Sequence, residues 1–84
     1  MSRSDISMRQ LRYFVAASET GQFSQAAAAV HVSQSAVTTA VMQLEQRLGV
    51  KLFERLPNGV NLTAEGNKFF QHARHILDTL QDAI

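Results

Sequence analysis

Residues 23–49 read FSQAAAAVHVSQSAVTTAVMQLEQRLG, and this stretch decides the fold. Its alanine-rich first part predicts a short helix from residue 25 to about residue 30, with Ser24 as the N-cap residue. Because alanine carries little bulk, another helix can approach this one closely. His31 and Val32 then leave room only for a tight connection.

A longer helix is predicted after this connection. Ser33 is a good N-cap residue, because its hydroxyl can accept a hydrogen bond from the backbone amide of Ser35 or Ala36. Apolar residues follow at helical spacing, at Val37, Val41, Leu44 and Leu48. Gly49 stands directly after them, where a left-handed C-cap favours a residue without a Cβ.

The two helices have the residue types of a helix-turn-helix. Such a motif needs a small residue where its helices touch, and that position falls on Ala27. It also needs apolar residues that lock the helices at a steep angle. The positions concerned hold Ala26, Val30, Val32, Val37 and Ala40. This pattern favours a helix-turn-helix, although alanine-rich helices also match it by chance.

The outward face of the longer helix is polar but uncharged. No formal charge occurs from residue 33 to residue 43, and the outward positions are Gln34, Ser35, Thr38, Thr39 and Gln43. These side chains suit close approach to DNA, since glutamine can pair bidentately with adenine and Ser or Thr can contact bases or phosphates. The free amides of a helix N-terminus also favour phosphate. A neutral face that simply meets solvent has the same composition, so both interpretations stay open at this point.

Two further elements flank the motif. A helix with apolar spacing from Met8 precedes it, with Ser7 or Asp5 as the N-cap residue and Gly21 as the end.

After the motif, residues 50–55 and 60–62 alternate with the period of a strand. Leu56-Pro57-Asn58-Gly59 lies between them, and Asn-Gly between two such runs is the strongest short hairpin signal. We expect a two-stranded wing over about residues 52–62, with an irregular loop as the alternative.

The last helix is long and has a broad apolar face. Thr63 is its N-cap residue, Glu65 suits the dipole of its first turn, and Gly66 weakens that turn. Phe69, Ala73, Ile76, Leu80 and Ala83 keep the spacing of a coiled-coil seam, and Phe70, Leu77 and Ile84 run beside them. This face is broader than one partner needs. We expect one half to pack on the chain's own winged domain and the other on a partner, and the pattern does not tell which half does which.

The elements together predict a mainly α fold. It is a winged helix-turn-helix of three helices plus a two-stranded β wing over residues 1–62, followed by a long linker helix over residues 63–84.

Composition excludes several other classes of protein. The 84 residues suffice for one domain, the absence of cysteine excludes disulfides and thiolate metal sites, and no run is long enough to span a membrane. No secretory signal opens in residues 1–5. His72 and His75 have a spacing compatible with a metal, but no third ligand is evident, so a solvated helix face is the better interpretation. We expect no catalytic residues, no metal and no cofactor.

The net charge of +1 is low for a protein that binds nucleic acid. Six basic and four acidic residues lie in residues 1–62, against two basic and three acidic residues in 63–84. Charge alone therefore does not point to DNA.

Six segments of the chain resemble a known family, the LysR-type transcriptional regulators of bacteria. They are residues 11–16 (LRYFVA), 21–27 (GQFSQAA), 32–38 (VSQSAVT), 44–50 (LEQRLGV), 52–55 (LFER) and 62–66 (LTAEG). They occur in the family's order and spacing, and the resemblance runs from about Met8 to Ile84.

The resemblance implies that the helix at about residues 34–48 enters the major groove of double-stranded DNA and that the wing lies at the adjacent minor groove. The implied contacts are Ser33, Gln34, Ser35, Thr38, Thr39 and Gln43 of the helix, and Arg55, Asn58 and Gly59 of the wing. It also implies an operator with two half-sites and a homodimer through the last helix. We assign that dimer contact to Phe69, Phe70, Ala73, Ile76, Leu77, Leu80 and Ile84.

Full-length members of the family carry a larger effector-binding domain after the linker helix. We expect this chain to be the DNA-binding domain without it, so that a small-molecule effector and higher oligomers belong to a full-length chain. We also expect a bacterial cytoplasmic location on the nucleoid, without a membrane partner.

The chain departs from the family's pattern at several contact positions. Ser35 stands where proline is frequent, which restores a backbone donor at the helix N-terminus. Thr39 stands where arginine is common, and Asn58 and Asn61 lie in a wing that is often arginine-rich. Because fewer cations neutralise fewer phosphates, we expect weak binding by one domain, a shallow salt dependence and a strong dependence on pairing.

Two classes of function remain. The first is a transcription regulator that binds DNA. The second is a winged helix used for protein association, with the last helix as the active surface, since fold does not fix function.

Overall fold

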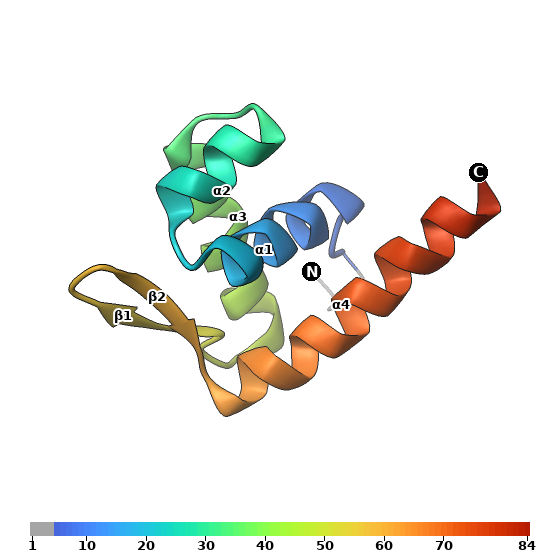
Figure 1. The fold of residues 1–84 in the computed structure, drawn as a ribbon. Helices are drawn as coiled ribbons and strands as arrows, with labels where there is room; N and C mark the ends of the chain where they lie inside the picture. The colour runs from blue at the N-terminus through green and yellow to red at the C-terminus, as the bar shows by residue number, and fades with distance from the viewer. Residues whose placement is uncertain (1–4) are drawn as a thin grey trace.

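The computed structural model describes residues 5–84. Residues 1–4, where the sequence predicts no secretory signal, lie outside the described part. The elements follow the order α1 (Met8–Thr20), α2 (Phe23–Val30), α3 (Gln34–Leu48), β1 (Phe53–Leu56), β2 (Gly59–Leu62) and α4 (Ala64–Ala83). Figure 1 shows α1, α2 and α3 gathered into one body, with the hairpin projecting on one side and α4 on the other. This is the mainly α arrangement that the sequence predicts.

Side-chain caps set the start of three helices. The Ser7 hydroxyl accepts from the Gln10 amide while the Gln10 side chain accepts from the Ser7 amide, so Ser7 is the cap of α1 through a reciprocal capping box. The predicted caps at Ser33 and Thr63 are confirmed, since each hydroxyl accepts from the backbone amide three residues later. Gly49 ends α3 in the left-handed conformation with φ of 71°, as predicted.

The predicted start of α2 is wrong. The helix begins at Phe23 rather than at residue 25, and its N-cap residue is Gln22, which makes no side-chain cap. Ser24 lies inside the first turn. The Thr20 hydroxyl holds the preceding turn through the Gln22 carbonyl at 3.0 Å, which lets α2 start with Phe23 buried in the core. At its other end, His31 takes the left-handed C-cap conformation with φ of 61°, unusual for a residue other than glycine.

The core is centred on Phe14 of α1. Its ring has no exposed surface and lies 5.4 Å from the ring of Phe53 and 5.2 Å from that of Phe69, measured between centroids. Phe53 in turn lies 5.5 Å from Phe23. These contacts join α1, α2, β1 and α4 in one aromatic cluster.

The helix-turn-helix residues pack as the sequence predicts. Ala26, Ala27, Val37 and Ala40 are buried, and Val30 and Val32 are half-buried against the core. The angle between α2 and α3 is therefore held by small side chains on α2 and by the apolar stripe of α3.

The hairpin is present, with two differences from the expected strands. β1 and β2 pair antiparallel in the register Phe53 with Leu62 and Leu56 with Gly59, so the two-residue turn is Pro57-Asn58. The alternation expected from Val50 onward is not followed, because Leu52 and Phe53 are both buried. Leu52 lies before the strand begins and enters the core directly.

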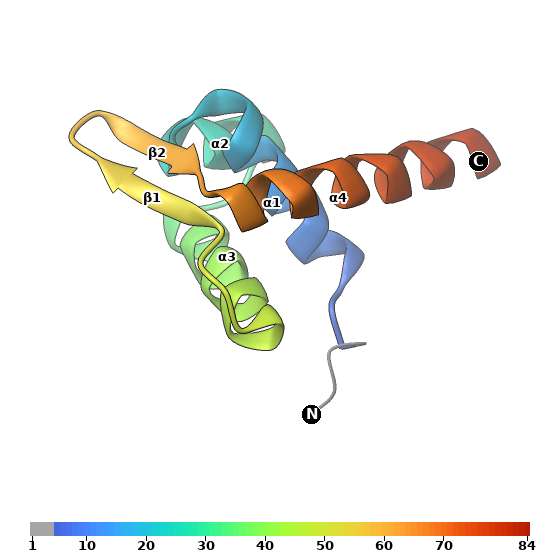
Figure 2. The same cartoon turned by 90° about the horizontal axis from the view of Figure 1, so that it is seen from below.

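The first half of α4 belongs to the same core. Ala73 has no exposed surface, and Phe69, Phe70 and Leu77 pack against the buried cluster. Arg74 donates to Glu19 of α1 at 3.1 Å and to Asp78 at 2.8 Å, and its hydrogen bond with Asp78 is the main cause of its raised pKa. The C-terminal half of α4 extends away from the body (Figure 2).

Gly66 gives a test of how closely α4 sits on the base of the wing. A Cβ at this position would collide with the backbone carbonyl of Leu52, a contact that cannot move like the end of a flexible side chain. We predict that Gly66→Ala lowers the free energy of unfolding by about 1–3 kcal/mol, although alanine favours a helix by about 1 kcal/mol. Urea denaturation measures the change. Asn67→Ala, at the exposed next position, is the control, and a Gly66→Ala chain of equal or higher stability than this control contradicts the packing.

Candidate nucleic-acid interface

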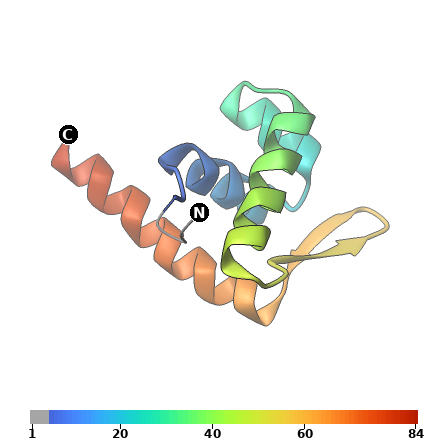
Figure 3. The same cartoon turned by 180° about the vertical axis from the view of Figure 1, so that it is seen from behind.

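One face of α3 is buried and the opposite face is open. Val37, Val41 and Leu44 are almost without exposed surface, which fixes the rotation of the helix. Gln34, Ser35, Thr39 and Gln43 are consequently exposed, as the sequence predicts for the outward face, while Thr38 is half-buried. Figure 3 shows α3 in green on the outer surface, with the wing beside it and α4 passing behind.

The N-terminal turn of α3 presents hydroxyls and a free backbone amide. The Ser33 hydroxyl accepts from the Ala36 amide at 3.1 Å and lies 3.1 Å from the Ser35 hydroxyl. Among residues 5–84 the backbone amide of Ser35 has no acceptor. The Thr38 hydroxyl donates to the Gln34 carbonyl at 3.1 Å, so its proton is already used inside the helix.

The structure brings Gln34 and the wing to one groove. This groove lies between the starts of α2 and α3 and the hairpin, and the predicted contacts that line it are Gln34, Arg55, Asn58 and Gly59. Gln22 and Ser24 also line it, and neither is among the predicted contacts. The elements that carry these side chains are far apart in the sequence, so the groove exists only in the folded chain.

The wing is held against the turn between α1 and α2. The Val60 amide donates to the Gly21 carbonyl at 2.9 Å, and the Gln22 side chain donates to the Asn58 carbonyl at 2.9 Å. Gly59 passes so close to the Gly21 carbonyl that no Cβ would fit there. The tip of the wing therefore has a defined place relative to α3.

Arg55 is positioned by an aromatic contact. Its guanidinium lies 5.1 Å from the centroid of the Phe23 ring, within the range of a cation–π interaction. The side chain stays exposed, so its donors remain available at the groove.

A second groove lies along α3 on the side of α1. The predicted contacts that line it are Ser33, Ser35, Thr39 and Gln43, joined by Ser7, Arg9, Gln10 and Tyr13 of α1 and its cap. Arg9 is the charged residue among those that the described part of the chain places there. Arg9 and Gln10 are not among the predicted contacts, because nothing in their spacing shows that the start of α1 lies beside α3.

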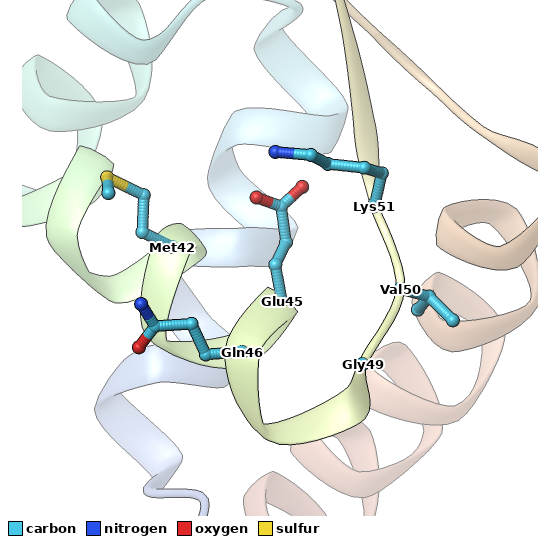
Figure 4. A pocket seen from close by; sticks show the side chains of 6 residues that line it. All are labelled: Met42, Glu45, Gln46, Gly49, Val50 and Lys51. Carbon is cyan, nitrogen blue, oxygen red and sulfur yellow. The ribbon is translucent and has the colours of Figure 1, made fainter.

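Glu45 ties α3 to the start of the wing. Its carboxylate accepts from the backbone amide of Leu52 at 2.8 Å and from that of Phe53 at 3.4 Å. Figure 4 shows the side chain pointing from α3 toward the segment that carries Lys51, across the turn at Gly49. No feature of the sequence singled out this residue.

The expected dimer residues fall into two groups. Phe69, Phe70 and Leu77 are half-buried against the chain's own core, and Ala73 has no exposed surface. Ala73, which the sequence analysis assigned to the dimer contact, therefore packs in the chain's own core. Ile76, Leu80 and Ile84 are 43%, 40% and 90% exposed. Leu80 and Ile84 share a groove with half-buried Leu77, Val15 of α1 and Val30 of α2.

No helix within residues 5–84 is both long and apolar enough to cross a membrane. Within the same residues, no group of three or more His, Cys, Asp or Glu side chains is placed to hold a metal ion.

Comparison with known proteins identifies the family. The model of the bacterial regulatory helix-turn-helix proteins of the lysR family matches residues 8–67, most of the chain. The chain belongs to the LysR family. The match includes α1, α2, α3 and the wing, so it covers all the residues of both grooves beside α3 except Ser7.

Curated LysR relatives are similar over most of this chain. The regulator TfdT of Cupriavidus pinatubonensis is 47% identical over 74 residues, which cover 88% of this chain and 32% of that protein. ClcR of Pseudomonas putida is 51% identical over 69 residues, 82% of this chain and 24% of that protein. The chain thus spans a third or less of the length of these relatives.

Solved structures of LysR proteins have the same fold. The DNA complex of the CbnR DNA-binding domain matches with a TM-score of 0.87 at 43% identity, covering 92% of this chain and 88% of that one. The BenM DNA-binding domain bound to catB site 1 DNA matches with a TM-score of 0.87 at 35% identity, covering 92% and 86%.

The Glu45 anchor can be tested in the free chain. Glu45→Ala leaves the Leu52 and Phe53 amides without their acceptor in a partly buried place, and we predict a loss of about 1–3 kcal/mol in the free energy of unfolding. Amide hydrogen exchange at Leu52 should accelerate. Glu45→Gln keeps an acceptor oxygen and should lose less. Gln46→Ala, at the exposed neighbouring position, is the control, and equal stability of the two alanine variants would exclude an anchoring role.

Proposed function

We propose that this chain binds double-stranded DNA sequence-specifically and serves bacterial transcription regulation, with α3 in the major groove and the wing at the adjacent minor groove. The observation that carries the proposal is the groove in which Gln34, at the start of α3, meets Arg55 and the wing tip. The major groove is wide enough for a helix, whereas the minor groove admits a narrow cationic side chain. The folded chain presents Gln34 of α3 for the major groove and Arg55 of the wing for the minor groove.

The polar contacts divide by chemistry. Gln34 and Thr39 are exposed on α3, where they suit base edges. The Ser35 amide and hydroxyl and the cation of Arg9 suit phosphates beside the same helix. The titles of the CbnR and BenM structures describe DNA complexes of domains with this fold, which supports the same role here.

The proposal includes pairing of two chains. The formal net charge of +1 gives one domain little nonspecific attraction to DNA, so joining two domains increases the affinity substantially. Residues 63–84 serve as the linker in this proposal, and the exposed group Ile76, Leu80 and Ile84 forms the contact with a second chain. Phe69, Phe70 and Leu77 hold the linker on its own domain.

The remaining parts of the proposal concern the full-length protein. The relatives' greater length leaves room for a further domain, to which we assign an effector and any higher oligomer. A regulator that acts on bacterial DNA works in the cytoplasm, at the nucleoid, and needs no catalytic residue or cofactor.

DNA binding and the role of Gln34 can be tested together. The chain should bind DNA in a gel-shift assay and lose affinity as salt rises. Gln34→Ala should reduce binding to the preferred sequence by about 1–3 kcal/mol and relax base preference at one position per half-site, measured by selection from random DNA. Gln46→Ala, an exposed glutamine of α3 outside both grooves, should keep the preference.

Two results would argue against this function. Equal weakening on all sequences would show that Gln34 only positions the backbone. The absence of any salt-sensitive DNA binding at micromolar protein would overturn the function and favour the association role of the winged helix.

Pairing through α4 can be tested with a charge placed on its exposed apolar residues. Ile76→Asp or Leu80→Asp places a charge in the exposed apolar group and should give a folded monomer in analytical ultracentrifugation, with circular dichroism unchanged. Thr79→Asp adds the same charge at an exposed polar position of α4 and should remain dimeric. A dimer that survives both apolar substitutions would place the contact elsewhere.

A further inference from the structure

We propose that a hydrogen-bonded relay from Ser7 through Gln10 to Gln43 fixes the side-chain amide of Gln43, so that its oxygen is turned to Gln10 and its NH2 group is presented to DNA. The relay begins at the backbone amide of Ser7, which can act only as a hydrogen-bond donor. The backbone amide of Ser7 donates to Oε1 of Gln10 at 2.8 Å. Because a backbone N–H can only donate, the atom of Gln10 that faces it must be the oxygen.

The orientation of the Gln10 amide in turn determines which atom of Gln43 accepts from it. With Oε1 of Gln10 turned to Ser7, Nε2 of Gln10 points to α3 and donates to Oε1 of Gln43 at 2.8 Å. Two amide NH2 groups cannot hydrogen-bond to each other, so the atom of Gln43 in this contact must also be the oxygen. The orientation of the Gln43 amide thus follows from the cap of α1.

The position of the relay gives this orientation a consequence for binding. Gln10 is half-buried and Gln43 is exposed on the outward face of α3, in the groove that Ser33, Ser35 and Thr39 also line. A bidentate contact with adenine needs the oxygen and the nitrogen of the amide turned to the base together. In this chain the oxygen is turned to Gln10, and Nε2 remains as the group for a ligand.

The inference rests on the proposed DNA binding and specifies the chemistry of one contact. Gln43 fits an acceptor, such as N7 or O6 of guanine, O4 of thymine or a phosphate oxygen. It does not fit the bidentate edge of adenine, and the exocyclic amino group of cytosine would have to reach an oxygen that is turned to Gln10 and already accepts from it. Gln10 is a positioning residue that touches no base itself.

The decisive variant is Gln10→Glu. Glutamate at this position completes a Ser-x-x-Glu capping box, so the Ser7 amide keeps its acceptor and the helix its cap. A carboxylate has no N–H to donate, and it attracts the Nε2 group of Gln43. The Gln43 amide should therefore turn over and present its oxygen to DNA. Arg12→Gln is the charge control, because it changes the net charge by the same amount at an exposed position of α1 that lines neither groove beside α3.

Selection from random DNA and titration on the preferred site separate the two kinds of acceptor. If Gln43 contacts a base, Gln10→Glu should shift one position per half-site toward cytosine or adenine by about 3- to 10-fold. If it contacts a phosphate, the variant should bind every sequence about 3- to 10-fold more weakly than Arg12→Gln does, with base preference unchanged. A Gln10→Glu chain with wild-type preference and the affinity of Arg12→Gln overturns the proposal.

A measurement on the free chain keeps this test apart from the test of function. In ¹⁵N NMR spectra, Gln10→Glu should shift the Gln43 side-chain amide signals while the Ser7 amide stays protected from exchange, and Gln10→Ala should expose Ser7 as well. Unshifted Gln43 signals in both variants overturn the relay. A wild-type chain with these signals but without DNA binding overturns the proposed function and the role of Gln43 in it.

Discussion

The ring of Phe14 is the contact on which the arrangement of the other elements depends. It is fully buried and meets Phe53 at the base of the wing and Phe69 in the first half of α4. Aromatic pairs of this kind contribute about 0.5–1.5 kcal/mol beyond the burial of their area. The wing and the linker helix are therefore fixed to the same point of α1, and the position of one constrains the position of the other.

The hairpin needs this constraint because two strands alone are marginally stable in water. Phe53 fixes one end of the hairpin in the core, and the carboxylate of Glu45 satisfies the backbone just before and at the start of β1. The Gly21 carbonyl and the Gln22 side chain hold the other end. Together these contacts set the place of Arg55 relative to Gln34, which the proposed reading of two adjacent grooves requires.

Local signals in the sequence predict most of the fold. Ser33 and Gly49 mark both ends of α3 because a cap is a contact between neighbours in the chain. Gln10 and Gln43 are 33 positions apart, and their contact depends on how α1 crosses α3. Similarly, spacing finds the apolar face of α4 but cannot separate Ala73, which meets the chain's own core, from Ile76, which does not. The predicted start of α2 is wrong because the burial of Phe23 in the core outweighs a good local cap at Ser24.

The low net charge becomes understandable once the positions of the side chains are known. Arg9 and Arg55 line the two grooves on opposite sides of α3, so cations flank a helix that itself carries no charge over its outward residues. Uncharged amides and hydroxyls distinguish sequences by whether their donors and acceptors meet partners, and each mismatch leaves a polar group unsatisfied. Two flanking cations supply less sequence-independent attraction than an arginine-rich surface, and so less binding to incorrect sites. Under the proposed function, such a domain gains discrimination at the expense of affinity, and a second domain held through α4 restores affinity without adding charge.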